Sequence, residues 1–548
     1  MKITYKNRLI INILIAYIIS LFFYSCYKEE KHDQNKIFRY NESANITTLD
    51  PAFAKDQAII WACNQIYNGL VQLDDGLNIE PCIAKSWTIS EDGRIYKFIL
   101  RDDVYFHNHE LIGSKRRVVS SDFVYSFNRL VNEKTASPGA WIFNLVEKNN
   151  GVYGFESPND STLIIRLKTA FSPFLGLLSM PYSFVLPKEV VEHYGQDFRS
   201  NPVGTGPFYY KYWKEGVKLV LRKNNNYFEK DIDGSLLPYL EAVSISFIID
   251  KQSVFLEFVK GNIDFISGID PNYKDEILTR HGELQDKYKD KIELISNPYL
   301  NTEYLGFMVD EEISPKDNPL LNKKIRQAIN YGFDREKMIR YLRNNIGYPG
   351  EYGIIPIGMK GFDSTAKAYT YRPELALQLL EEAGYPNGEG LPPITLQTTS
   401  SYLDLSKYIQ SELNQLGFKI RIDVNPPGAL REMISQSKSD WFRGSWIADY
   451  PDAENYLSLF YSKNFCPKGP NYTHFSNKEY DRLYEAAQRE KSEEKRIELY
   501  KKMNSIIIEE SPIVVLYYDQ VLRFAQKNVI NLGSNPVNLL DLKRVRKE

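Results

Sequence analysis

A β-α-β succession in the second half of the chain constrains the fold more than any other feature. A strand pattern from Ile394 to Thr398 precedes a helical pattern from Leu405 to Leu416, and a second strand pattern runs from Lys419 to Val424. Gly417 ends the helix, as glycine commonly does. This order favours two parallel strands joined by a right-handed crossover. We therefore expect an α/β sheet in this part of the chain.

The next predicted strand ends in an acidic residue surrounded by aromatic side chains. It follows a short predicted helix and reads WFRGSWIADY from Trp441 to Tyr450. Because strand side chains alternate, one face of it carries Arg443, Ser445, Ile447 and Asp449. Phe442, Trp446 and Tyr450 add the aromatic surface.

A carboxylate in such a setting is costly unless a cation meets it, and a ligand ammonium could be that cation. The alternative is that Asp449 or Asp452 caps a helix that begins near Pro451. Ligands of open α/β sheets bind beyond the carboxyl ends of the strands, which is where Asp449 should lie. We therefore favour Asp449 as a ligand contact.

The first half of the chain has the patterns of a mixed α and β region with hairpins. Gly204-Thr205-Gly206 is followed at once by Pro207 and an aromatic strand, so no helix N-terminus is available to receive a phosphate. We interpret it as a turn into an antiparallel hairpin of residues 208–213 and 218–222. Ser120 or Ser121 begins a predicted helix, and Pro373 begins another.

Composition excludes several classes of partner and of enzyme. The 548 residues include 68 basic and 70 acidic side chains, so the formal net charge of −2 gives no electrostatic reason to expect nucleic acid. The length is enough for three or four domain-sized units. The six histidines are scattered, and the sequence contains no G-x-S-x-G and no run of metal ligands. We expect no enzymatic activity, no cofactor and no metal.

The N-terminus resembles a bacterial lipoprotein signal. Lys2, Lys6 and Arg8 precede an apolar run from Leu9 to Phe23, and Ser25-Cys26 follows. On this interpretation residues 1–25 are removed, Cys26 carries the lipid, and residues 26–36 form a polar tether. An ordinary signal peptide or an N-terminal anchor helix is the alternative.

The remaining cysteines and a histidine pair do not indicate a metal site or a catalytic residue. Cys63, Cys82 and Cys466 fit no metal spacing, so we expect buried free thiols, with one disulfide conceivable and no catalytic cysteine. His107 and His109 would share a strand face, which is compatible with a metal pair. We expect exposed hairpin histidines instead.

Five sequence blocks, in order, resemble the family 5 extracellular solute-binding proteins. They are IAKSWTISEDGRIYKFILRDDVYF, NPVGTGPF with KNNNYF, KKIRQAINYGFDREKMI, RPELALQLLEEAGYPNGEG and WIADYPDAENYLSLF. The resemblance spans about residues 38 to 525. It implies an α/β, two-lobed periplasmic-binding-protein-like fold of type II, cluster C, with an inserted α+β domain. The implied first lobe is 37–68, 169–268 and 511–548, the inserted domain is 69–168, and the second lobe is 269–510.

The resemblance also implies a function and a site. The protein would be a lipid-anchored, extracytoplasmic receptor, monomeric, that captures oligopeptides in a cleft between its lobes and delivers them to the membrane subunits of an ABC importer. Asp449 would pair with the ligand's α-ammonium and Arg443 with the carboxylate of a short peptide, while the peptide main chain adds as a strand. The other implied contacts are Ser445, Trp446, Ile447 and Tyr450.

Other functions remain open beside this one. The same family binds nickel complexes, haem and glutathione, and a surface receptor without an importer is a further alternative. An envelope peptidase is the alternative from another class, and it would need a nucleophile with its base, or a metal.

Overall fold

The computed structural model describes residues 36–270 and 273–548. The predicted signal of residues 1–25, the lipid site at Cys26 and the tether up to residue 35 lie outside this part of the chain. Within the described residues, no helix has the length and apolar character needed to cross a membrane.

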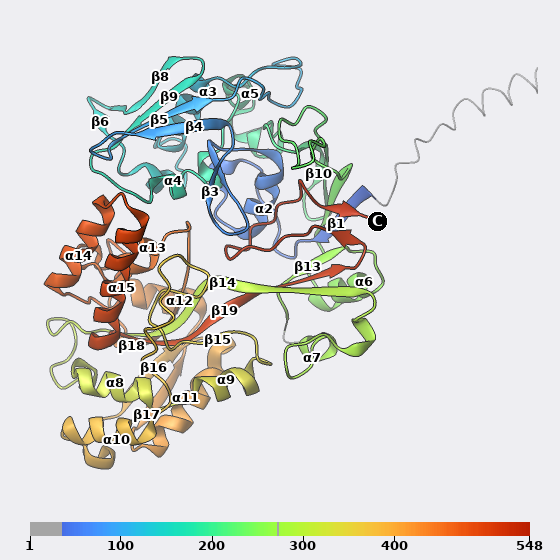
Figure 1. Ribbon diagram of the computed structural model, residues 1–548. Coiled ribbons are helices and arrows are strands. Elements are labelled where there is room, and N and C mark those ends of the chain that lie inside the picture. Colours follow the sequence, from blue (N-terminus) through green and yellow to red (C-terminus); the bar gives the residue numbers. More distant parts are fainter. Residues whose placement is uncertain (1–35, 271–272) are drawn as a thin grey trace, which may run out of the picture.

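A single sheet runs through both halves of the molecule (Figure 1). In spatial order its strands are β10 (Phe208–Lys214), β11 (Lys218–Lys223), β12 (Ala242–Ser246), β1 (Ile37–Asn41), β13 (Phe265–Ser267), β19 (Ile513–Gln526), β14 (Ile292–Phe307), β18 (Trp441–Ile447), β16 (Ile394–Thr398) and β17 (Ile420–Val424). The short β15 (Tyr348–Pro349) pairs with β19. The hairpin β10-β11 and the parallel pair β16-β17 confirm the sequence-based predictions.

Two long antiparallel strands, β14 and β19, connect the halves. The N-terminal part of β14 pairs with the C-terminal part of β19 near α6, on the right of Figure 1, and their other ends pair near β18, on the left. The ladder is interrupted between the pairs Pro298–Gln520 and Thr302–Tyr518. Three residues of β14 therefore lie opposite one residue of β19, which gives the strands a bulge at the boundary between the halves.

The upper half contains a main core and a separate antiparallel sheet. The core includes one face of α2 (Gln57–Ile66), with Ala62, Cys63 and Ile66 fully buried. The second sheet has the order β4 (Ala84–Ile89), β5 (Ile95–Leu100), β9 (Thr162–Arg166) and β8 (Phe155–Asn159), and α3 (Ser120–Leu130) packs against it. Residues 273–292, including α7 (Lys274–Ile277), lie lower in Figure 1, on its right, but belong to this half because they share a core with α6 (Lys251–Val259) and β13.

The lower half surrounds the β16-β17-β18 end of the sheet with helices (Figure 1). They are α8 (Lys323–Tyr331), α9 (Arg335–Leu342), α10 (Pro373–Glu382), α11 (Leu403–Gln415), α12 (Pro427–Ser435), α13 (Glu454–Leu457), α14 (Lys478–Arg489) and α15 (Glu493–Glu510). Shorter elements of the upper half are β2 (Val71–Leu73), β3 (Ile79–Pro81), β6 (Lys148–Asn149), β7 (Val152–Tyr153), α4 (Phe174–Leu177), α5 (Lys188–Tyr194), β20 (Val529–Ile530) and β21 (Arg546–Lys547).

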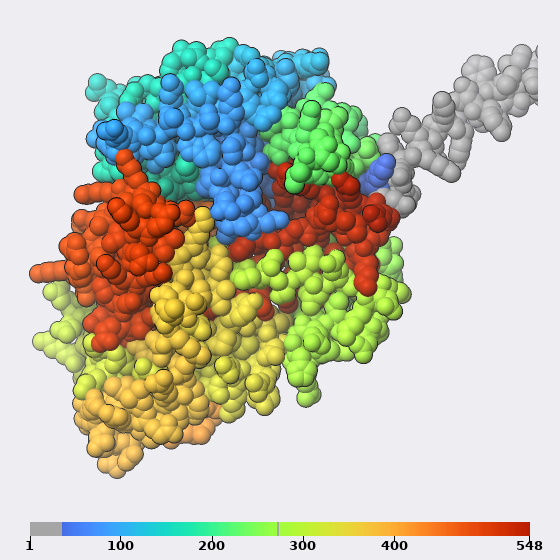
Figure 2. All heavy atoms as spheres, in the orientation of Figure 1, coloured from blue at the N-terminus to red at the C-terminus, as the bar shows by residue number. Residues whose placement is uncertain are grey.

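The second sheet and the segment after it touch the lower half directly. The backbone N–H of Ser172 donates to the carbonyl of Gln488 at 3.0 Å, and the Lys491 ammonium donates to the carbonyl of Glu91. Figure 2 shows the corresponding blue and orange surfaces in contact. The two halves thus meet both at the crossing strands and at a second place away from them.

The described chain begins and ends in the same half. The Lys547 ammonium donates to the carbonyl of Ile37 at 2.9 Å and pairs with Asp264 at 2.9 Å. Both charged side chains of this pair are buried, so the C-terminal strand is fixed against the first strand.

The prediction of an exposed His107 is wrong, and its cause is a long-range contact. His107 is buried, its Nε2 lies 3.0 Å from the carbonyl of Gly206, and its Nδ1 accepts from the N–H of Gly204. Burial lowers the pKa of His107 to about 4. A side chain on Gly204 would collide with the carbonyl of Ile66, so glycine lets this loop lie against α2. The three remaining cysteines are buried and unpaired, as predicted.

Candidate ligand-binding site

Asp449 lies just beyond the end of β18, beside the bulge in β14. Strand β18 runs antiparallel to β14 from Trp441–Phe307 to Ile447–Asn301. After the strand ends, the N–H of Ala448 donates to the carbonyl of Leu300 at 2.9 Å. Asp449 is therefore at the boundary between the halves, at the carboxyl end of its strand.

The carboxylate of Asp449 has one weak polar partner and no cationic one. The Asn455 amide donates to its Oδ2 at 3.4 Å, and no ion pair to Asp449 occurs among the described residues. Solvent reaches the residue, yet the protein around it removes enough water to raise the pKa of the carboxyl. Access together with partial desolvation is expected of an acid on the wall of a cleft.

The upper half contributes a tyrosine to the surroundings of this acid. Burial, and to a smaller extent the Asp449 charge, raise the pKa of Tyr182 to about 12. On the same side, the ring of Trp141 lies 6.4 Å from that of Tyr450, centroid to centroid. Asp449 and Tyr450 therefore face the upper half of the molecule.

Asp452, and not Asp449, makes a side-chain contact at the start of α13. Its Oδ1 accepts from the backbone N–H of Glu454 at 2.9 Å and from the Tyr500 hydroxyl at 2.6 Å, and its Oδ2 accepts from Arg496 at 3.3 Å. Asp452 is buried and has its structural partners in place. Asp449 makes no such cap contact at α13.

Arg443 has an internal partner that the sequence did not reveal. Its Nη2 forms an ion pair with Oε2 of Glu303 on β14, and its guanidinium lies 3.5 Å from the ring centroid of Tyr402. Glu303 is almost fully buried; burial raises the pKa of its carboxyl and the Arg443 charge opposes that rise. The Nε–H of Arg443 has no hydrogen-bond partner in the described chain.

A second arginine pair extends this cluster across the bulge. Arg343 donates to Asp519 and to the Tyr517 hydroxyl, both at 2.8 Å. The Asn301 amide lies between the two acids, 3.2 Å from Glu303 and 3.4 Å from Asp519. Two arginines thus balance two acids, so the cluster is close to neutral.

A cavity of about 660 Å³ opens beside this cluster, between the halves. Its lining comes from both of them and includes Gln57, Ser267, Tyr299, Arg343, Tyr402 and Asp519. Asp519 is the residue of β19 that faces the bulge, so the cavity lies against the interrupted part of the ladder.

The other predicted contacts lie on either side of Asp449. Trp446 is half-buried and its indole N–H donates to Oδ1 of Asn455 at 2.8 Å, so Trp446 and Asp449 share one amide. Tyr450 is buried and its hydroxyl donates to Glu454. Ser445 is half-buried and Ile447 is exposed at the strand end. The structure brings Trp446, Asp449 and Tyr450 together, whereas Arg443 lies toward the other end of β18.

Metal ligands do not gather in this part of the protein. Across residues 36–270 and 273–548, no group of three or more histidine, cysteine, aspartate or glutamate side chains is placed to hold a metal ion.

The fold defines a two-lobed protein whose lobes are joined by paired strands and enclose a cavity. The chain belongs to the bacterial extracellular solute-binding proteins of family 5: the model described as "Bacterial extracellular solute-binding proteins, family 5 Middle" matches residues 78–465. The predicted two-lobed α/β fold class is confirmed.

Relatives and solved structures agree with this family. The glutathione-binding protein GsiB of Salmonella typhi is 27% identical over 501 residues, which is 90% of this chain and 91% of GsiB. The periplasmic binding protein DppA of Helicobacter pylori, solved with the peptide STSA, is 25% identical with a TM-score of 0.73, over 94% of this chain and 99% of DppA. HbpA2 of Haemophilus parasuis has a TM-score of 0.82 at 22% identity, over 93% and 100%.

Proposed function

We propose that this protein captures oligopeptides between its lobes and delivers them to an ABC importer. The observation that carries the proposal is Asp449, a solvent-accessible carboxylate at the lobe boundary with a raised pKa and no cationic partner among the described residues. A peptide's α-ammonium would supply the missing charge. The likeness to DppA, which was solved with a peptide, supports this ligand class.

In this proposal the backbone of β18 binds the peptide main chain. Strand β16 pairs with β18 only at Gln397–Phe442. From Arg443 to Ile447, no strand of the described residues pairs with that side of β18. Such an edge can accept an extended peptide as an added strand, and recognition through the backbone tolerates many side-chain sequences.

The remaining proposed contacts surround this edge. Trp446 and Tyr450 would form aromatic walls near the ligand's N-terminus, with Ser445 and Ile447 along the strand. Arg443 would meet the carboxylate of a short peptide. Because Glu303 already neutralises Arg443, this contact should contribute less than that of Asp449.

The lobes would close by rotating about the bulge in β14. The interrupted ladder between Pro298 and Thr302 has few hydrogen bonds to break when the lobes move. A ligand that touches both lobes would favour the closed arrangement. The lobes and inserted domain would follow the division given by the sequence, except that residues 273–292, which share a core with α6 and β13, would belong to the first lobe. The lipid at Cys26 would fix the monomer to the extracytoplasmic face of a membrane.

Glutathione is the second candidate ligand. The similarity to GsiB favours it, and glutathione also has a free α-ammonium. Calorimetry with a tripeptide, the same tripeptide N-acetylated, and glutathione separates the possibilities. We expect the free tripeptide to bind and the acetylated one to lose affinity by at least about a hundredfold. Equal binding of both tripeptides would overturn the role of an ammonium site.

The peptidase alternative has its own test. A mixed peptide pool is incubated with the purified protein and analysed by mass spectrometry. We expect intact peptides to be recovered from the protein after denaturation, because a binding protein retains its ligand unchanged. Release of fragments would instead support an enzyme.

A further inference from the structure

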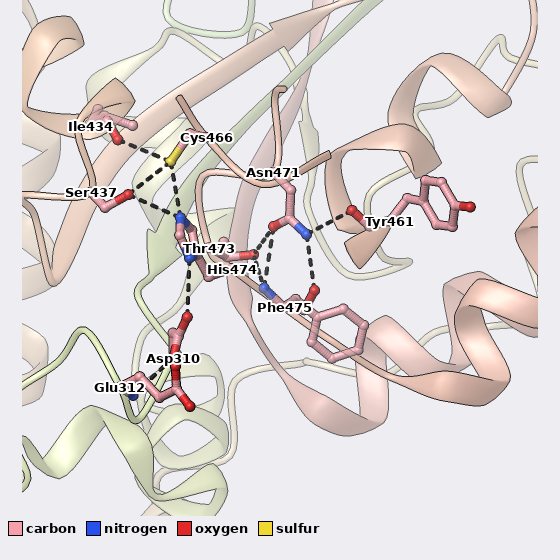
Figure 3. Close-up of polar contacts among 10 residues, drawn as sticks. All are labelled: Asp310, Glu312, Ile434, Ser437, Tyr461, Cys466, Asn471, Thr473, His474 and Phe475. Atoms are coloured by element: carbon pink, nitrogen blue, oxygen red, sulfur yellow. Dashed lines mark hydrogen bonds and ion pairs between the residues drawn. The ribbon is translucent and has the colours of Figure 1, made fainter. Parts of the chain in front are cut away.

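A second polar cluster, drawn in Figure 3, includes Ser437 from the segment that precedes β18, whereas Asp449 follows the strand's other end. The Sγ of Cys466 is 3.3 Å from Nε2 of His474, and Nδ1 of His474 is 3.2 Å from Oδ2 of Asp310. The Ser437 hydroxyl lies 3.1 Å from the sulfur and 3.0 Å from Nε2. The order is therefore thiol, imidazole, carboxylate, with a hydroxyl beside the first two.

The loop that carries His474 is fixed by a buried asparagine. Asn471 is fully buried, and its amide donates to the carbonyls of Tyr461 and Phe475 at 3.1 and 2.9 Å. Its Oδ1 accepts from the Thr473 hydroxyl and the N–H of Phe475 (Figure 3). The ring of Phe465 stacks on the imidazole with centroids 4.6 Å apart. The imidazole is thus held in one orientation.

Two of the four residues have backbone that is unfavourable for their type. Ser437 has φ of +56° and His474 has φ of +52°, in the left-handed region that glycine prefers. Such residues cost about 1 kcal/mol or more each and gather at functional sites. For His474 the surrounding loop contacts hold this conformation, and the result is the alignment of the imidazole between sulfur and carboxylate.

The arrangement suits proton transfer and does not suit a metal. Asp310 accepts from Nδ1–H, which leaves the lone pair of Nε2 directed at the thiol. An imidazole oriented in this way takes the proton of a neighbouring thiol and produces the nucleophilic thiolate. The two ring nitrogens point in opposite directions, so one ion cannot contact both Cys466 and Asp310.

We propose that Cys466 is a peroxide-reactive thiol, with His474 as its general base and Asp310 as a positioning residue. The thiolate attacks one oxygen of hydrogen peroxide, the S–O bond forms and the O–O bond breaks. The leaving hydroxide takes the proton from the His474 imidazolium and becomes water. Cysteine is oxidised to sulfenic acid and the peroxide is reduced by the same two electrons.

The other two cysteines provide an internal comparison. Cys63 and Cys82 are 0% and 3% exposed and have no imidazole partner in the described chain, and burial raises the pKa of both thiols, that of Cys82 to about 12. Cys466 is 5% exposed. Asp310, on the far side of the imidazole, has 22% of its side chain accessible. Access is therefore limited to a small oxidant such as hydrogen peroxide.

The test is trapping of sulfenic acid in the full chain. The folded protein is treated with hydrogen peroxide for set times, the reaction is stopped in denaturant that contains dimedone, and labelling at each cysteine is followed by peptide mass spectrometry. We expect Cys466 to be labelled at least about tenfold faster than Cys63 or Cys82. His474→Asn should slow Cys466 about tenfold and steepen its pH dependence, since asparagine tolerates a positive φ but cannot take the proton. His281→Asn is the matched control and should change nothing.

Two results would overturn the proposal. One is labelling of Cys466 no faster than of Cys82. The other is an unchanged rate and pH profile in folded His474→Asn, which would make the cluster a structural network. If that variant does not fold, Asp310→Asn decides: we expect a smaller slowing with an unchanged circular dichroism spectrum, and an unchanged rate would reject the role of the imidazole.

Discussion

The two ends of the side of β18 proposed to face the ligand differ in how their charges are matched. At one end Arg443 is paired with Glu303 and stacked on Tyr402, and a second arginine pair adjoins it. At the other end, the side chain of Asp449 has only the weak contact from Asn455 among the described residues. The Arg443 charge is thus neutralised inside the protein, whereas the described residues provide no counter-charge for Asp449.

This difference indicates that Asp449 can contribute more to binding than Arg443. A ligand carboxylate at Arg443 must compete with Glu303, so little net attraction remains. A ligand ammonium at Asp449 competes only with water and one amide, and it removes the cost of a partly desolvated carboxylate. Four expected results, from the largest effect to the smallest, test this comparison.

Removal of the Asp449 charge should have the largest effect. Asp449→Ala should weaken binding of an oligopeptide with a free N-terminus by about 3 kcal/mol, because the ammonium loses its only counter-charge. Calorimetry measures the affinity, and thermal unfolding checks that the fold is intact. Asp423→Ala, on an exposed strand end, is the matched control. Unchanged affinity in a folded Asp449→Ala protein would refute the assignment.

Substitution of Arg443 should affect stability more than binding. Arg443→Met leaves Glu303 buried without its cation and should lower the free energy of unfolding by about 2 kcal/mol. The double variant Arg443→Met with Glu303→Gln should recover part of that loss. Chemical denaturation measures both. A large loss of peptide affinity with unchanged stability would reverse the comparison.

Glu454, in the segment beside Asp449, should make the stability of the protein depend on pH. It is buried, accepts from the hydroxyls of Tyr450 and Tyr484, and burial raises its pKa to about 7. Because the folded state holds this proton more tightly than the unfolded chain, the contribution of Glu454 to stability is full below about pH 4.5 and is lost as the pH rises through 7. Glu454→Gln should therefore be more stable than the wild type by about 1 kcal/mol at pH 8 and nearly equal at pH 5. If the variant and the wild type were equally stable at pH 8 as well as at pH 5, the raised pKa of Glu454 would be contradicted.

The smallest expected effect is the pH dependence of binding. The carboxyl of Asp449 must be ionised to meet an ammonium, and its raised pKa means that protonation begins at a higher pH than for an exposed aspartate. Affinity for a free peptide should decline as the pH is lowered from 7 to 5. The N-acetylated peptide should show no such decline. A decline shared by both peptides would point to other groups.

Local patterns predicted much of the fold. The β16-α11-β17 unit, the hairpin β10-β11 and the start of α10 at Pro373 each follow from periodicity and turn residues within a short window. The crossing strands were not predicted. In β14 the polar residues Asn297, Asn301 and Glu303 interrupt any alternation, because the strand passes from one lobe to the other and both of its faces become buried.

Part of the site depended on contacts between distant segments. Asp449 could be singled out from its own strand, yet Glu303 lies 140 residues before Arg443 and nothing near Arg443 indicates it. A glutamate directly before the aromatic and apolar end of β14 was the one available signal. The burial of His107 and the cluster at Cys466 were hidden for the same reason, since Gly206 lies 99 residues from His107 and Asp310 lies 164 from His474.

The hydrogen bond from the Lys547 ammonium to the carbonyl of Ile37 joins β21, at the end of the chain, to β1, at the start of its described part. Any attachment made upstream of Lys36 would hold only the lobe that contains both strands, while the other lobe pivots at the bulge of β14. The cleft between the lobes would then open and close through movement of the second lobe alone. A partner bound to the protein could detect the position of that lobe while the first lobe stays fixed.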